Sequence, residues 1–166
     1  MIVLDTNVVS EMGRQAPSAR VMDWLDQWQD SDVYITSVTE SEIRYGVALV
    51  PAGKRRTELQ RFAAGVLDRT FGARNLPFDS DAAKIYARIA SRQRLAGMTV
   101  SVPDIQIAAI AASRGFMLAT RNEKHFVHSG VRVVNPWTVQ TAKPGWVAGL
   151  RGIATRLGAV RSAGRT

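Results

Sequence analysis

Three polar side chains stand where a parallel β-sheet would bring them to one edge. Asp5 directly follows a short apolar run, Ile2 to Leu4, and Asp104 lies at the predicted start of a helix. Asn122 comes just after the fourth apolar run of the chain. Because sites in open parallel sheets form at the carboxyl ends of the strands, we expect Asp5, Asp104 and Asn122 to share one pocket.

Glu42 is the fourth candidate, because it interrupts an apolar face of a predicted helix. The positions i, i+4, i+8 and i+11 of that face are occupied by Val38, Glu42, Gly46 and Leu49. This spacing predicts that Glu42 faces inward, whereas Glu40 points elsewhere and is expected to pair with Arg44. A carboxylate on a buried face is costly unless a positive charge meets it, and a divalent cation would supply that charge.

The chemistry that this set could perform is metal-assisted hydrolysis. Mg²⁺ and Mn²⁺ prefer carboxylate oxygens and retain waters, one of which can attack a phosphodiester while the cation screens its charge. Each residue also has an ordinary structural interpretation. Asp5 could simply cap a helix, Asp104 could complement a helix dipole, Glu42 could pair with a buried arginine, and Asn122 could shape a turn. The residues alone leave these alternatives open.

The elements that must position this set alternate between short apolar strands and helices. That alternation predicts one α/β domain, a three-layer α/β/α sandwich with a central parallel sheet. We assign the domain to residues 1–137 and a basic tail to residues 138–166. Strands are expected at 2–4, 33–35, 76–78, 116–119 and 131–134. Helices are expected at 6–12, from 17–18 onward, and at 38–50, 53–71, 81–95 and 103–113.

The composition is that of an ordinary globular protein that contains no cysteine. The chain of 166 residues has no cysteine, which excludes disulfides, thiolate metal sites and a cysteine nucleophile. No apolar run approaches the roughly 18 residues that would span a bilayer. The opening MIVLDTNVV contains Asp5 and no basic stretch, so it predicts a core strand and not a signal peptide. We therefore expect a cytoplasmic protein without a membrane partner.

The net charge of +8 is concentrated at the C-terminal end. Residues 1–123 hold 15 basic and 14 acidic residues, whereas residues 124–166 hold 7 basic residues and no acid. A basic segment favours a polyanionic partner through counterion release. The spacing of Leu150, Ile153, Leu157 and Val160 indicates a helix, but three glycines oppose it. We expect a partly ordered basic arm that strengthens the binding of a polyanionic partner.

The order of these segments resembles the PIN domain and, within it, the VapC- and FitB-type toxin nucleases. The resemblance covers about residues 1–137. MIVLDTNVVSE resembles the opening motif, TSVTESEIRYGV the second block, VPDIQIAAIA the third and LATRNEKHF the fourth. VNPW resembles a common closing element of the FitB-like branch. Four motifs in order are a specific signal.

The resemblance implies an Mg²⁺- or Mn²⁺-dependent endoribonuclease, the toxin of a type II toxin–antitoxin pair. It implies catalytic roles for Asp5, Glu42, Asp104 and Asn122, with Asp5 and Asp104 as direct metal ligands and Glu42 and Asn122 acting through water. Thr6 and Ser37 are implied as auxiliary residues. The implied partners are RNA, a cognate antitoxin and a second copy of the chain, in a homodimer or a higher assembly. The face formed by Trp24, Leu25 and Trp28 would suit a partner helix, although such a face is more often core.

Two positions depart from the family pattern. The fourth block has Asn122 instead of an aspartate, which removes a charge but keeps an oxygen ligand, and His125 stands where relatives often carry a second aspartate. The alternatives are a weak or inactive PIN module that binds RNA or a partner, and a housekeeping RNA-processing nuclease without an antitoxin. Retention of Asp5, Glu42 and Asp104 argues against an inactive module.

Overall fold

A computed structural model of the protein describes residues 1–99 and 101–139. Its centre is a five-stranded sheet in which every pairing is parallel, in the order β3-β2-β1-β4-β5. The strands are β1 (Ile2–Leu4), β2 (Val33–Thr36), β3 (Asn75–Leu76), β4 (Met117–Ala119) and β5 (Val133–Val134). Because β2 and β4 flank β1, the residues that follow these three strands emerge side by side at one edge.

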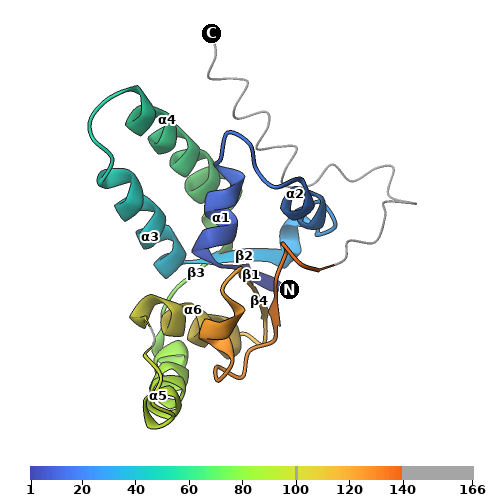
Figure 1. Ribbon diagram of the computed structural model, residues 1–166, viewed down its shortest axis with the longest axis vertical. Helices are drawn as coiled ribbons and strands as arrows, with labels where there is room; N and C mark the ends of the chain where they lie inside the picture. Colours follow the sequence, from blue (N-terminus) through green and yellow to red (C-terminus); the bar gives the residue numbers. More distant parts are fainter. Residues whose placement is uncertain (100, 140–166) are drawn as a thin grey trace.

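Helices cover both faces of the sheet, which confirms the predicted α/β/α sandwich (Figure 1). One apolar core joins the sheet to the first four helices, and the other joins it to the last two. The helices are α1 (Thr6–Met12), α2 (Ala19–Leu25), α3 (Ser37–Ala48), α4 (Lys54–Ala63), α5 (Ser80–Leu95) and α6 (Val102–Ser113).

Side-chain caps set where several of these helices begin. The side chain of Thr36 accepts a hydrogen bond from the Thr39 amide at the start of α3, and Asp79 caps α5 in the same way. Ser101 caps α6, with a proline inside its first turn. Each cap satisfies an amide that has no partner within the helix. The helix starts next to the candidate site are therefore determined by short polar side chains.

The predicted inward face of α3 is wrong in its second half. Leu49 is 65% exposed and Gly46 is also exposed. The buried row instead contains Thr39 and Ile43. A helix of 12 residues is about 18 Å long, whereas a strand of four residues spans only about 13 Å. The last turns of α3 therefore extend past the sheet, where Leu49 is exposed although Val47 still packs against the core.

Two other predictions need adjusting. The strand expected at 76–78 is Asn75–Leu76, because Pro77 has no amide hydrogen with which to continue the ladder. The helix expected at 53–71 consists of α4 followed by a π-helical segment, Ala64–Thr70.

The tryptophan face of α2 belongs largely to the core. Trp24 is 5% exposed and Leu25 is fully buried, and both belong to the core on the α1–α4 side of the sheet. Trp28 is half-buried, with its ring 5.6 Å from that of Trp24. For Trp24 and Leu25, the core interpretation is the correct one.

The described residues contain no helix long and apolar enough to cross a membrane. Of the predicted tail, only Thr138 and Val139 are described, and both donate backbone hydrogen bonds to the carbonyl of Asn135. The predicted helix at 150–160 lies outside the described residues.

Candidate active site

Asp5 is the most enclosed acid of the candidate set, at 4% exposure. It follows β1, and its amide donates to the carbonyl of Ala119, which pins the residue against the end of β4. Its Oδ1 accepts from the Thr6 amide at 2.7 Å, so Asp5 does cap α1. Its second oxygen is engaged differently, which shows that capping is only part of its environment.

A small polar network holds the second oxygen of Asp5. Oδ2 accepts from the hydroxyl of Thr120 at 2.6 Å and from the amide group of Asn7 at 2.5 Å. Thr120 is fully buried, and its hydroxyl oxygen also accepts from the Asn7 side chain and from the Asn122 amide. These donors are neutral, so they orient the carboxylate without cancelling its charge.

Glu42 reaches the site from α3. The hydroxyl of Thr6, the first residue of α1, donates to Glu42 Oε2 at 2.5 Å. Thr6 thus links the two acids, since its amide holds Asp5 and its hydroxyl holds Glu42. The predicted pair between Glu40 and Arg44 is also present, with Nε 2.6 Å from the carboxylate.

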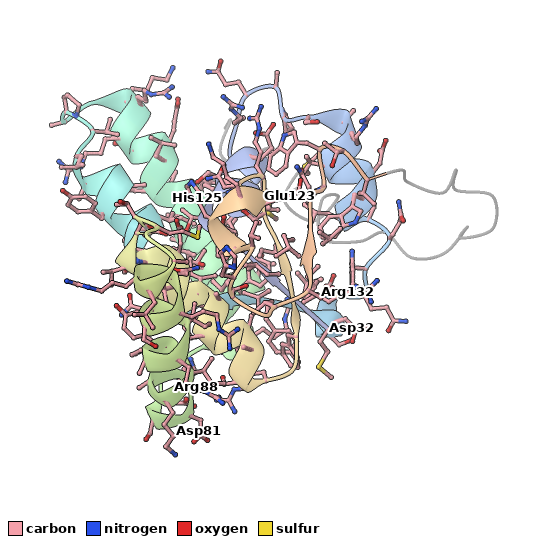
Figure 2. The ribbon with its side chains drawn as sticks, turned by 60° about the horizontal axis from the view of Figure 1, so that its bottom comes forward. Asp32, Asp81, Arg88, Glu123, His125 and Arg132 are labelled. Carbon is pink, nitrogen blue, oxygen red and sulfur yellow. The ribbon has the colours of Figure 1, made fainter. Side chains whose placement is uncertain are left out.

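Asp104 lies in the first turn of α6, where its Oδ2 is 2.9 Å from Nδ1 of His125. His125 belongs to a short 3₁₀ segment, Glu123–Phe126, that follows β4. Figure 2 shows His125 and Glu123 together on this segment, far from Asp81 and Arg88 on α5. His125 is therefore a partner of a candidate site residue.

Asn122 and Ser37 lie at the same edge of the sheet but make weaker connections. Asn122 is exposed, and its backbone makes two hydrogen bonds: its amide donates to Thr120 and its carbonyl accepts from the His125 amide. Ser37 is half-buried at the start of α3. The roles predicted for both residues remain predictions.

The site carries an excess of negative charge, which affects the pKa of Asp5. Burial raises the pKa of Asp5 above its ordinary value of 3.8, and the charges of Asp104 and Glu42 raise it further. The hydrogen bonds from Thr120 and Thr6 act in the opposite direction but do not cancel these effects. Thr6 binds both Asp5 and Glu42, and the charge of Asp104 also acts on Asp5, so we call these three carboxylates the acidic cluster.

A hard divalent cation fits this cluster by its chemistry. All the candidate ligands are oxygens, and within the described residues no lysine or arginine forms an ion pair with Asp5, Glu42 or Asp104. In that same part of the chain, no three acidic or histidine side chains already stand in a metal-binding arrangement. Mg²⁺ and Mn²⁺ need only one or two direct carboxylates, because they keep several waters.

The raised pKa of Asp5 predicts how the metal-free protein responds to pH. Between 3.8 and the folded-state pKa, the native protein binds more protons than the unfolded chain, so stability falls as the pH rises through this window. Mn²⁺ requires the deprotonated carboxylate and should oppose that fall. Thermal unfolding across this window, with EDTA and with Mn²⁺, measures both effects. Parallel EDTA curves for wild type and Asp5→Asn would contradict the prediction.

Sequence reasoning missed two residues that shape this site, Asn7 and Thr120, and it named His125 only as a departure from the family pattern. Asn7 and Thr120 lie inside motifs that were recognised, but neither was distinguished from its neighbours. The available signal was their position, since Asn7 follows Asp5 by two residues and Thr120 directly follows β4. Partners of this kind can be sought among polar residues that directly follow a buried strand, where that strand neighbours the one that precedes a candidate acid.

Comparisons with known proteins identify the family of this chain. The PIN domain family matches residues 2–129. The VapC ribonuclease Y4jK of Sinorhizobium fredii is 40% identical over 82% of this chain and 98% of its own length. Toxin FitB of Neisseria gonorrhoeae is 42% identical over 82% of this chain and 99% of its own length. A solved structure of FitAB bound to an IR36 DNA fragment superposes with a TM-score of 0.79, at 40% identity, over 85% of this chain and 99% of that one. Its fold and these matches show that the chain belongs to the PIN domain family.

Proposed function

We propose that this protein is a metal-dependent endoribonuclease and the toxin of a type II toxin–antitoxin pair. The observation that carries the proposal is the acidic cluster, in which a buried aspartate meets two further carboxylates and neutral donors only. The names of the relatives, a VapC ribonuclease and a toxin, support the same activity. The substrate class is RNA, whose phosphodiesters such a site can hydrolyse.

In this proposal Asp5 and Asp104 hold Mg²⁺ or Mn²⁺ directly, while Glu42 and Asn122 act through water. When bound, such a cation screens the scissile phosphate and lowers the pKa of an attacking water. The Thr6 hydroxyl holds Glu42 in place. An amide at position 122 keeps an oxygen without adding a charge, so we expect a weaker metal site than one with a fourth carboxylate.

His125 positions Asp104 in this scheme. Its Nδ1 lies against one carboxylate oxygen of Asp104, which leaves the other oxygen for a cation. Ser37 stands at the start of α3, on the same edge of the sheet, and is proposed to line the pocket.

The proposed partner is an antitoxin protein, and the proposed place of action is the cytoplasm. The solved relative is described as FitAB bound to DNA, a name that joins FitB with a second component. A neighbouring short gene for a DNA-binding protein that binds this chain would distinguish a toxin from a housekeeping nuclease. We also propose a homodimer or a higher assembly.

The direct test is to purify the full chain free of partners and incubate it with total RNA. We expect cleavage with Mn²⁺ or Mg²⁺ and none with EDTA, because the carboxylates require a cation before they can approach a phosphate. Mapping the new RNA ends identifies the cleavage sites. RNA that remains intact under all metal conditions, while the protein still binds it, would instead support the inactive RNA-binding module.

A further inference from the structure

A cavity of about 250 Å³ lies next to the acidic cluster. Its walls come from α1 and the turn after it, from Arg121, two residues after the end of β4, and from the segment after β5. The lining residues are Asn7, Ser10, Glu11, Arg14, Arg121 and Trp137. It is smaller than the roughly 300–1,000 Å³ of pockets that enclose drug-sized ligands, so its size suits part of a nucleotide, such as a base, and not a larger ligand.

The cavity and the acidic cluster share a side chain. The amide group of Asn7 donates to Asp5 Oδ2, and its Oδ1 accepts from the backbone amide of Arg121 at 3.1 Å. Asn7 is therefore the only residue between the cavity and Asp5 along this chain of hydrogen bonds. A strand of RNA whose scissile phosphate lies at Asp5 would place a neighbouring nucleotide at this cavity.

Arg121 and Trp137 form a cation–π pair on one wall. The guanidinium carbon of Arg121 lies 5.3 Å from the centre of the Trp137 ring. The backbone of Trp137 is anchored at both ends, since its amide donates to Asn135 and its carbonyl accepts from Arg20. Among the described residues, no carboxylate pairs with Arg121. Aromatic rings and guanidinium planes are the surfaces on which proteins stack unpaired bases.

The second cation of the cavity, Arg14, is held by Glu11. Glu11 is 5% exposed and accepts from the Ser18 amide and from Arg14, whose own side chain is 63% exposed. The cavity thus carries two guanidinium groups and one carboxylate. The neighbouring cluster of Asp5, Glu42 and Asp104 repels phosphate, so cations outside the cluster are needed to attract the strand.

We propose that this cavity is a nucleotide subsite for single-stranded RNA, with a base stacked against the Arg121–Trp137 pair and a phosphate at the two guanidinium groups. The proposal rests on the proposed ribonuclease function. A protein partner could also contact these side chains, but the link through Asn7 to Asp5 favours the substrate.

The test measures RNA affinity apart from cleavage. In an Asp104→Asn background with EDTA, a short fluorescein-labelled single-stranded RNA of mixed sequence is titrated with protein and followed by anisotropy. Trp137→Ala should weaken binding by about 5-fold or more, since a stacked base contributes roughly 1–3 kcal/mol, and it should leave the salt dependence unchanged. Trp137→Phe keeps a ring and should lose less.

Arg121→Ala has a different signature. Loss of one phosphate contact should flatten the slope of log affinity against log salt by about 0.7, and Arg121→Lys should largely restore it. Matched controls are Arg88→Ala on α5 and Tyr45→Ala on α3, both exposed and outside the cavity (Figure 2 labels Arg88). Both controls should bind RNA as the parent does.

The outcomes separate the subsite from the activity. Parental affinity in both folded variants, Trp137→Ala and Arg121→Ala, together with an unchanged salt slope overturns the subsite, even if the wild-type protein cleaves RNA. The subsite is also overturned if these variants bind RNA normally but no longer bind the co-expressed product of the neighbouring gene. That result would instead make the cavity a surface for a protein partner. A wild-type chain that cleaves no RNA with Mn²⁺ contradicts the proposed function separately, because the binding assay does not depend on cleavage.

Discussion

Replacing Asp5 by asparagine should reduce metal-dependent RNA cleavage by at least ~100-fold. Loss of a residue that only supports a metal ligand costs about 10–100-fold, so loss of the central ligand should cost more. Asp5 is the acid whose pKa responds to both other carboxylates. The measurement is the initial rate of cleavage of a defined RNA at saturating Mn²⁺. Asp81→Asn, an exposed acid on α5 paired with Lys84, is the matched control and should retain the full rate.

The hydrogen bonds of Asp5 complicate the stability of this variant. Both carboxylate oxygens accept, from Thr6 on one side and from Asn7 and Thr120 on the other. An asparagine must therefore turn its amide group towards a donor and lose a hydrogen bond. Relief of repulsion among the acids opposes that loss, so the melting temperature of Asp5→Asn alone does not report the repulsion.

Glu42→Gln is the cleaner companion variant. The Gln carbonyl oxygen can still accept from the Thr6 hydroxyl, so the hydrogen bond remains while one negative charge is removed. We expect a reduced cleavage rate together with a small rise in the melting temperature of the metal-free protein. If both Asp5→Asn and Glu42→Gln are folded and cleave at the wild-type rate, the acidic cluster is not the catalytic centre.

The local signals in the sequence were enough to place the helix starts and strand ends. Asp5 caps a helix directly after a strand, and Asp104 lies in the first turn of a helix that begins with a serine cap and a proline. These features depend on a few consecutive residues. Parallel topology then brings distant strand ends together, which is why the acidic edge could be predicted from one chain.

The contacts between distant segments could not be predicted in the same way. The hydroxyl that holds Asp5 comes from Thr120, and the ring that meets Asp104 comes from His125. Each partner leaves only a weak local signal, because a threonine after a strand and a histidine in a polar loop are common for other reasons. The prediction of the inward face of α3 was wrong for a related reason. The sequence of a helix does not encode the length of the sheet on which the helix packs.

Thr120→Val should weaken Mn²⁺ binding by about 10–100-fold, the range found when a partner of a metal ligand is lost. Thr120 Oγ donates to Asp5 at 2.6 Å and lowers the pKa of that carboxyl against the effect of burial. Without the hydroxyl, the pKa of Asp5 rises further, and the cation must displace a proton that is held more firmly. The Mn²⁺ binding curve should therefore shift to higher pH, in addition to its loss of affinity.

Calorimetric titration of Mn²⁺ at several pH values measures both effects, and Thr120→Ser provides the control. Serine keeps the hydroxyl at the fully buried position of Thr120 and should bind Mn²⁺ close to wild type. Valine also removes the acceptor for the Asn122 amide, so a lower melting temperature is expected with the fold intact. A folded Thr120→Val protein with wild-type Mn²⁺ affinity at every pH would show that Asp5 does not need this hydroxyl, and that burial and the neighbouring charges alone set its affinity for the cation.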